Sequence, residues 1–222
     1  GSDAFIVCED ANLVKAAESA ALGRLQNCGQ TCIASKRFII HEKVFDSFLF
    51  LLLKNFKKYE IGNPNDAKTN FSEMAREDLA DDLEQQYKTA LENGAEYILP
   101  LERISKAGFK PGILKMNEEN PVNDEELFGP LAMVYSGKSD EELLAIANNT
   151  LFGLGNSVWT GDKEKALFFA ENLESGTVSI NQITKSDVRL PFGGTKNSGY
   201  GVELSLYALN EFVSKKTIIG NL

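Results

Sequence analysis

Apolar residues follow two different periods that alternate along the 222-residue chain. Short runs rich in β-branched and aromatic residues predict buried strands, whereas apolar positions three and four apart predict helices. Strands are expected at 4–9, 37–42, 95–100, 131–136, 156–160 and 177–181, with one more at 215–220. Helices are expected from Asp10 onward and at 44–59, 72–93, 139–149 and 162–175. The turn-rich stretch 103–125 carries no clear pattern.

Residues typical of helix ends support these boundaries. Asp10 is expected to cap the first helix, and Ser139 with Glu142 three positions on forms a capping-box pattern. Gly94 and Gly176 follow two of the predicted helices, where glycine commonly ends them. Strands that alternate with helices predict an α/β fold, in which a mainly parallel sheet carries helices on both faces.

Composition and charge exclude several classes of protein. The net charge of −9 repels phosphate backbones, so nucleic-acid binding is not expected. The longest apolar run, "FLFLLL" at 48–53, is too short to span a membrane. Three cysteines without framework spacing favour a reducing cytoplasm over a disulfide scaffold.

The stretch "NCGQTC" at 27–32 raises a question of chemistry. A structural zinc site needs about four ligands, and the chain offers only three cysteines and one histidine. Cys8 lies inside a predicted buried strand, so these residues are not expected to converge and no metal site is predicted. Cys28 and Cys32 lack the Cys-x-x-Cys spacing of dithiol oxidoreductases. His41, expected as a partly exposed strand-end residue, would lie roughly 20 Å or more from Cys32 along an extended strand. No histidine is therefore expected to activate the cysteine.

Glycine motifs do not supply a nucleotide site either. "GLG" at 153–155 and "GYG" at 199–201 lack the third glycine of a dinucleotide fingerprint, and neither directly follows a strand. From the residues alone, Cys32 is either a nucleophile or a small buried apolar residue.

Four blocks in order resemble the aldehyde dehydrogenase family. They are "NCGQTCIASKRFIIHEKVFDSF" at 27–48, "EELFGP" at 125–130, "ANNTLFGLGNSVWTGD" at 147–162 and "LPFGGTKNSGYGVEL" at 190–204. Within that family, the opening "GSDAFIVCEDA" and the glycine-rich block are most similar to the bacterial succinate-semialdehyde dehydrogenases.

The resemblance implies a role for particular residues. Cys32 matches the nucleophile, which forms a thiohemiacetal and then a thioester with the aldehyde carbon. Glu126 matches the carboxylate that binds the nicotinamide ribose, and Phe128 matches the aromatic residue beside the nicotinamide ring. The aldehyde funnel would be lined by Thr31, Ile33 and Phe192. Cys28 matches no essential position and is expected to pack.

The resemblance also implies an organisation larger than these residues. Residues 1–212 match the catalytic domain and 213–222 match a C-terminal oligomerisation tail. The family's cofactor-binding domain, its glutamate base and an oxyanion-hole asparagine have no counterpart within this sequence. NAD or NADP would be the cofactor and a small aldehyde the substrate, in a homodimer or homotetramer. These residues alone are expected to bind cofactor poorly and to be inactive.

Substrate choice and two rival functions stay open at this point. Some succinate-semialdehyde dehydrogenases carry an arginine where this chain has Gln26, so Lys185 or Arg189 would have to hold the substrate's distal carboxylate. A non-enzymatic structural or interaction module of the same fold is one alternative. A thiol-redox protein using Cys28 and Cys32 is the other.

Overall fold

A mainly parallel sheet forms the centre of the computed structural model, which describes residues 1–117 and 119–221. Within these residues the strand order is β10-β9-β1-β2-β7-β6-β3, and only the edge strand β3 runs antiparallel to its neighbour. The strands are β1 (Asp3–Val7), β2 (Ser35–His41), β3 (Glu96–Leu99), β6 (Gly112–Lys115), β7 (Leu131–Gly137), β9 (Gly155–Trp159) and β10 (Thr177–Ile180). Two small ribbons pair β4 (Glu102–Arg103) with β5 (Phe109–Lys110) and β8 (Phe152–Gly153) with β11 (Thr195–Lys196).

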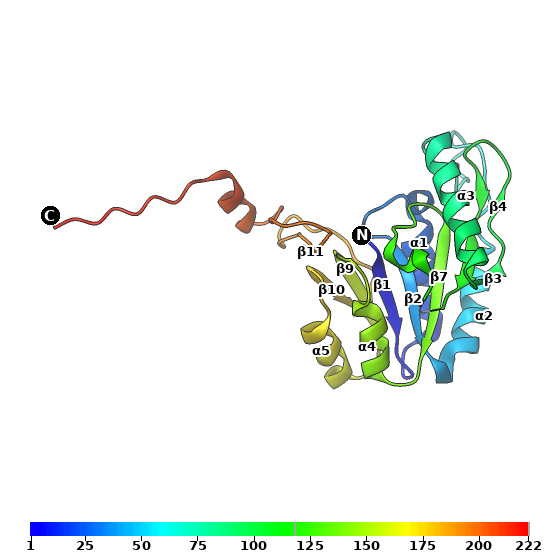
Figure 1. Cartoon of the computed structure of the whole chain (residues 1–222), viewed down its shortest axis with the longest axis horizontal. Coiled ribbons are helices and arrows are strands. Elements are labelled where there is room, and N and C mark those ends of the chain that lie inside the picture. Colours follow the sequence, from blue (N-terminus) through cyan, green and yellow to red (C-terminus); the bar gives the residue numbers. More distant parts are fainter. Residues whose placement is uncertain (118, 222) are drawn as a thin grey trace.

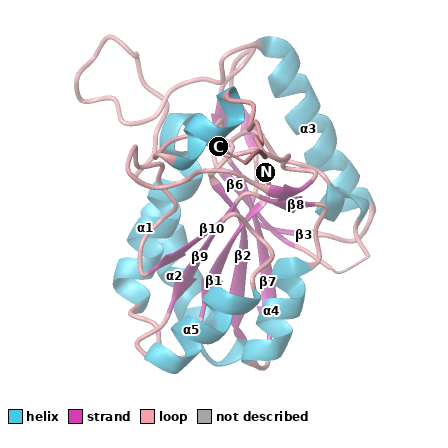
Figure 2. Ribbon diagram, turned by 90° about the vertical axis from the view of Figure 1, so that its left-hand side faces the viewer, coloured by secondary structure: helices cyan, strands magenta, loops and turns pink. Residues whose placement is uncertain are grey.

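Helices cover both faces of this sheet, which confirms the predicted fold class. α1 and α2 pack against each other on one face, and α4 lies on the other face with α5 beside it (Figures 1 and 2). The helices are α1 (Leu13–Leu25), α2 (Phe45–Phe56), α3 (Glu77–Glu92), α4 (Asp140–Asn148) and α5 (Lys163–Asn172). Short 3₁₀ helices are η1 (Gln26–Gly29), η2 (Glu42–Val44), η3 (Pro121–Asp124) and η4 (Tyr207–Phe212).

The sheet is buried on both sides, as parallel sheets require. Every residue of β1 and β2 is buried. Aromatic rings fill the space between sheet and helices: the Phe5 ring lies 5.3 Å from Phe38 and 5.5 Å from Trp159, centroid to centroid. Burial of these rings provides the main driving force for the core.

Two of the four predicted helix ends are confirmed, at Ser139 and Gly94, and two are wrong. α5 already ends at Asn172, with Leu173 as its C-cap, so Gly176 does not end it. Asn12 caps α1 instead of Asp10, because the Asp10 carboxylate accepts hydrogen bonds from Thr160 Oγ1 and the Gly161 amide. Ser139 caps α4 as predicted. Gly94 follows α3 with φ +87°, a conformation that glycine adopts without strain.

Three regions differ from the sequence prediction in secondary structure. The unassigned stretch 103–125 contains β6, a strand of the main sheet, and the helix predicted at 72–93 is five residues shorter at its start. No strand forms at 215–220. Residues 213–221 instead run away from the body (Figure 1). A strand that completes another subunit's sheet has no partner in a single chain, so this part of the prediction stays untested.

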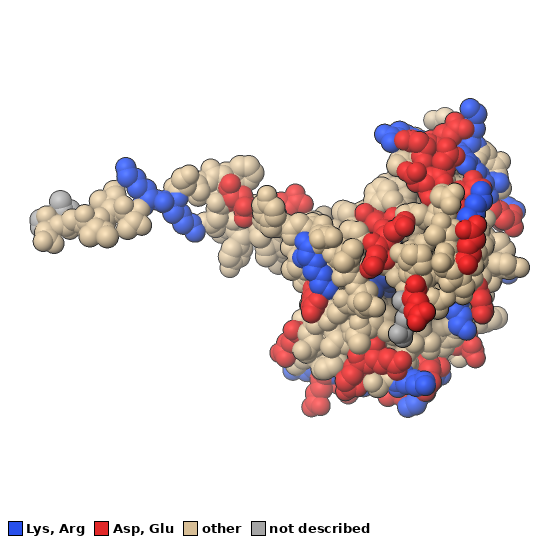
Figure 3. Space-filling view, viewed as in Figure 1, with Lys and Arg blue, Asp and Glu red and all other residues tan. Residues whose placement is uncertain are grey.

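Charge is distributed unevenly over the surface. Acidic side chains spread over the visible face of the body, in keeping with the net charge of −9 (Figure 3). The tail instead carries adjacent lysines, Lys215 and Lys216. No helix within the described residues is long and apolar enough to cross a bilayer.

Candidate functional site

The candidate site lies at the amino-terminal edge of the sheet. Cys32 comes just before β2, and Glu126 and Phe128 come just before β7. β2 and β7 are parallel neighbours, with Arg37 opposite Met133, so segments that precede the two strands meet at one edge. Ligands of open α/β sheets usually bind at the opposite, carboxyl edge. This site lies at the amino edge instead, because the motifs that carry Cys32, Glu126 and Phe128 precede their strands.

An unusual backbone path brings the cysteine segment to this edge. Asn27, Cys28 and Gly29 have φ values of 52°, 55° and 74°, in the left-handed region. At Gly29 a side chain is also excluded by contact, since a Cβ would overlap the carbonyl oxygen of Gly129. The turn folds Cys28 inward and leaves Cys32 exposed. Burial raises the pKa of the Cys28 thiol to about 12, so Cys28 packs as expected and is unsuited to redox exchange at neutral pH.

Arg24 ties the cysteine segment to the segment before β7. Its guanidinium is fully buried and donates to the carbonyls of Gly29, at 2.8 Å, and Leu127, at 3.2 Å, and also to that of Gly129. Burial lowers the pKa of Arg24 to about 10, so it keeps its charge at neutral pH. One buried cation thus holds both halves of the site together.

Lys36 makes a second connection nearer the thiol. Its ammonium, on a completely buried side chain, donates to the carbonyl oxygens of Thr31 at 3.0 Å and Cys32 at 2.9 Å. The same nitrogen lies 3.2 Å from Glu126 Oε1 and 6.0 Å from the centre of the Phe128 ring. Burial lowers the pKa of Lys36 to about 8, against the opposing pull of nearby carboxylates.

Glu126 and Phe128 face the solvent side of this cluster. The Glu126 side chain is 28% exposed, and its Oε1 also accepts from the Gly1 ammonium at 2.7 Å. Phe128 is 36% exposed, which is unusual for an aromatic ring next to buried elements. Both side chains are open to a ligand approaching from this edge.

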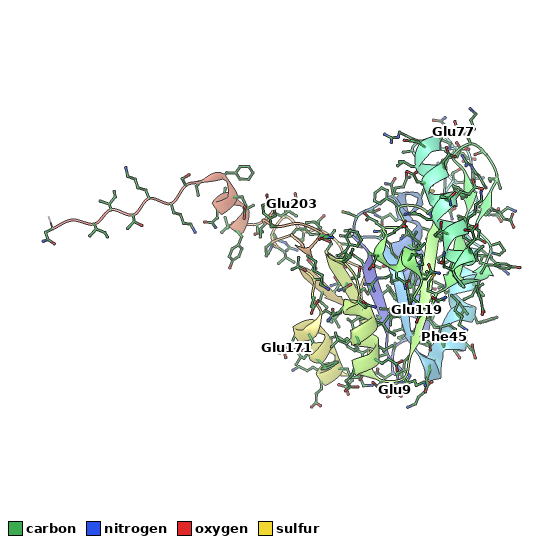
Figure 4. All side chains as sticks on the ribbon, in the orientation of Figure 1. Glu9, Phe45, Glu77, Glu119, Glu171 and Glu203 are labelled. Carbon is green, nitrogen blue, oxygen red and sulfur yellow. The ribbon has the colours of Figure 1, made fainter. Side chains whose placement is uncertain are left out.

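A cavity of about 500 Å³ lies in front of the thiol. Cys32 and Phe192 line it together with the glycine-rich segment at 193–203. Phe192 and Glu203 pair through both backbone hydrogen bonds, 2.9 and 2.8 Å long, which closes the segment into a loop. Glu203 lies where the C-terminal extension leaves the body (Figure 4). Cys32 and Phe192 therefore line the same cavity.

Thr31 and Ile33 line a second hollow, of about 270 Å³, which they share with Gln26 and Lys185. Thr31 and Ile33 thus line a different hollow from Phe192. Cys32, which lies between them in the sequence, lines the hollow of Phe192. Arg189 is absent from the lining of either hollow as described, and it forms a 2.6 Å ion pair with Asp187. Of the two cations considered for substrate binding, Lys185 is the one that lines this second hollow.

Arg24, Lys36 and Asp3 are the site residues that motif reading missed. Asp3 lies at the start of β1; one carboxyl oxygen accepts from the Gly155 amide at 3.2 Å and the other has no hydrogen-bond partner among the described residues. Burial raises its pKa to about 7. A signal was available: consecutive cations in the apolar run "SKRFIIH" must find buried acceptors.

His41 plays no part in this cluster. It lies at the far end of β2, where Nδ1 accepts from the Lys43 amide. The expectation of partial exposure was wrong, because its neighbours in the sheet leave the ring only 4% exposed. Among the described residues, no group of three or more His, Cys, Asp or Glu side chains is arranged to hold a metal ion.

Known proteins share both the sequence and this architecture. The family model described as the aldehyde dehydrogenase family matches residues 1–218. An aldehyde dehydrogenase of Paenarthrobacter nicotinovorans is 41% identical over 221 residues, 98% of this chain and 48% of that protein. An NADP(+)-type succinate-semialdehyde dehydrogenase of Mycobacterium ulcerans is 38% identical over the same shares of the two chains.

A solved structure agrees with the sequence match. The succinic semialdehyde dehydrogenase of Streptococcus pyogenes, crystallised with NADP+ as cofactor, superimposes with a TM-score of 0.94 at 36% identity. That alignment covers 100% of this chain and 50% of the other. The chain thus spans about half the length of the relatives it matches. By sequence and by fold, it belongs to the aldehyde dehydrogenase family.

Proposed function

We propose that this chain is the thiol-bearing part of an NAD(P)-dependent aldehyde dehydrogenase that oxidises succinate semialdehyde to succinate. The observation that carries the proposal is the placement of Cys32. Its side chain is exposed at a 500 Å³ cavity, while buried cations hold its segment next to Glu126 and Phe128. A cysteine kept only for packing would be buried, as Cys8 and Cys28 are.

Cys32 performs the covalent chemistry in this proposal. Its thiolate attacks the aldehyde carbon, a C–S bond forms, and the carbonyl electron pair moves onto oxygen, where the Cys32 amide donates a hydrogen bond. The bound NAD(P)+ supplies the acceptor for the hydride that leaves this carbon. Water then attacks the Cys32 thioester, releasing the carboxylic acid and the thiol.

Glu126 and Phe128 fit one end of the cofactor. A partly exposed carboxylate accepts hydrogen bonds from ribose hydroxyls, and an exposed ring offers a flat apolar face to nicotinamide. The 222 residues contain no dinucleotide fingerprint, so the rest of the cofactor would be held elsewhere. We accordingly assign 1–212 as the catalytic domain and 213–222 as a tail that adds a strand to another subunit.

Lys185 accounts for the substrate's carboxylate. It lines the hollow that Gln26, Thr31 and Ile33 also line, and these three residues are close in sequence to Cys32. Arg189 is neutralised by Asp187, with two hydrogen bonds of 2.9 and 2.6 Å between the side chains. Lys185 therefore replaces the arginine that some succinate-semialdehyde dehydrogenases carry at the Gln26 position.

NAD(P)H formation by the complete gene product tests the reaction. With succinate semialdehyde we expect steady cofactor reduction, and Cys32→Ser should lower kcat by about 10³-fold or more, because a hydroxyl is a far weaker nucleophile near neutral pH. The 222 residues by themselves should show negligible turnover. Unchanged activity in Cys32→Ser, or no activity of the complete protein on any aldehyde, would favour a non-enzymatic module.

A matched pair of variants tests the substrate. Lys185→Met should raise KM for succinate semialdehyde about tenfold or more, since the charged hydrogen bond to the substrate's carboxylate is lost. Its KM for butanal, which lacks the carboxylate, should stay unchanged. Arg189→Met is the control and should leave both values alone; the reverse result would assign the carboxylate to Arg189.

A further inference from the structure

The side chain of Lys36 joins two parts of the site that have different tasks. An ammonium group has three N–H donors and no acceptor. The nearest oxygens around Lys36 Nζ are the carbonyls of Thr31 and Cys32, at 3.0 and 2.9 Å, and Glu126 Oε1, at 3.2 Å. A further carbonyl, that of Ala34, lies at 3.4 Å. Two donors thus go to the cysteine segment and one to the carboxylate.

We propose that Lys36 is a positioning residue that couples the Glu126 carboxylate to the Cys32 segment, so that a ligand bound at Glu126 changes how firmly the thiol is held. The inference rests on the proposed function for its biological meaning. The coupling itself depends only on the contacts: Lys36 binds both the Glu126 carboxylate and the carbonyl of Cys32.

The location of Lys36 makes the coupling strong. Its side chain is fully buried, so water cannot replace a lost partner, and an unpaired buried group costs about 1–3 kcal/mol. Asp3 and Glu126 favour the charged form of Lys36, whereas burial and Arg24 oppose it. Glu126 is the partly exposed member of this set. It is therefore the partner that a ligand can reach.

A ribose at Glu126 would compete for the oxygen that Lys36 uses. Hydroxyl donors from the ligand satisfy the carboxylate, and Lys36 then shifts its remaining donor toward the carbonyls of Thr31, Cys32 or Ala34. Cofactor binding would in this way tighten the segment that carries the nucleophile. A lysine that merely satisfied buried carbonyls would not respond to Glu126.

Hydrogen–deuterium exchange of the 222-residue chain measures this coupling without catalysis. The readout is the exchange rate of amides in a peptide spanning 27–35. Glu126→Gln should speed this exchange about threefold or more, because a neutral amide holds the ammonium less firmly. Glu125→Gln is the matched control: its carboxylate accepts from Gln86 and makes no described contact with Lys36, so exchange should not change.

The double variant decides between coupling and independent effects. Lys36→Met should speed exchange of 27–35 about tenfold, and adding Glu126→Gln should then have no further effect. The proposal is overturned if Glu126→Gln behaves like Glu125→Gln, or if the two rate increases multiply. Should Lys36→Met not fold, Lys36→Arg takes its place, with partial loosening expected and the same test of non-additivity.

These outcomes are separable from those of the proposed reaction. Suppose that the complete protein oxidises no aldehyde while Glu126→Gln adds no further effect to Lys36→Met. In that case Lys36 still couples the two segments, and only the reaction assignment fails. If the protein is active and the two rate increases multiply, the coupling is wrong and the reaction assignment stands. In an active protein, Lys36→Met should lower kcat while changing the aldehyde KM by less than about twofold.

Discussion

The cysteine segment and the C-terminal region differ in how many contacts they make with the rest of the chain. Around Cys32, buried cations donate to the carbonyls of segments that are far apart in sequence, so contacts within the chain hold these segments together. Beyond residue 200, large apolar side chains lie open to solvent, with Phe212 87% and Ile219 93% exposed. The first region is held by its own contacts, whereas the second exposes large apolar side chains to solvent.

Removing Arg24 should produce the largest effect on this comparison. Arg24→Met leaves the buried carbonyls of Gly29 and Leu127 without their donor, and that of Gly129 keeps only the Leu131 amide. We expect the free energy of unfolding to fall by about 3 kcal/mol or more, since each unsatisfied buried group costs about 1–3 kcal/mol. Urea denaturation followed by circular dichroism measures this loss. A fall below about 1 kcal/mol would show that the segments hold together without the cation.

Gly29→Ala should rank second. The left-handed backbone disfavours alanine and its Cβ would overlap the Gly129 oxygen, so the segment must move. We expect a loss of about 2 kcal/mol or more. Gly199→Ala is the matched control, because Gly199 also has positive φ but no atom lies within 4 Å of the position that an alanine Cβ would take. Equal losses in the two variants would assign the whole effect to backbone strain.

Asp3 should give the core a pH dependence that the tail region lacks. Burial raises its folded pKa to about 7 from an ordinary 3.8. Between these values the folded state keeps a proton that the unfolded state has lost, so stability falls as pH rises from about 4 to 7. Relative to Asp3→Asn, the wild type should lose up to about 1.4 kcal/mol per pH unit in this range. Parallel stability–pH curves for the two proteins would contradict the burial argument.

Changes in the tail should have the smallest effect on folding. Ile219→Asp should leave the unfolding free energy within about 0.5 kcal/mol of wild type, because the side chain is exposed. If the tail adds a strand to another subunit, the same change should lower the assembly state of the complete protein, as measured by light scattering. Loss of thermal stability in a monomeric variant would show instead that the tail folds back onto its own body.

Reading the sequence located the layers of the fold better than its irregular parts. Stretches rich in aromatic and β-branched residues, such as "RFIIH", predict a strand. The strand at 112–115 was missed because a four-residue run among turn residues has no clear period. Asp10 was the expected cap but bonds to Thr160 and Gly161, about 150 positions away, which no local pattern reveals.

What the sequence determined by itself is the α/β class, the family, and which short motifs carry Cys32, Glu126 and Phe192. Local periodicity and ordered motifs are properties of the chain alone. Tertiary contacts alone reveal that Arg24 and Lys36 join the segments before β2 and β7, and that Lys185, not Arg189, lines the hollow of Thr31 and Ile33. The reason is physical: a buried cation's partners are chosen by whichever distant carbonyls the packed sheet brings within about 3 Å.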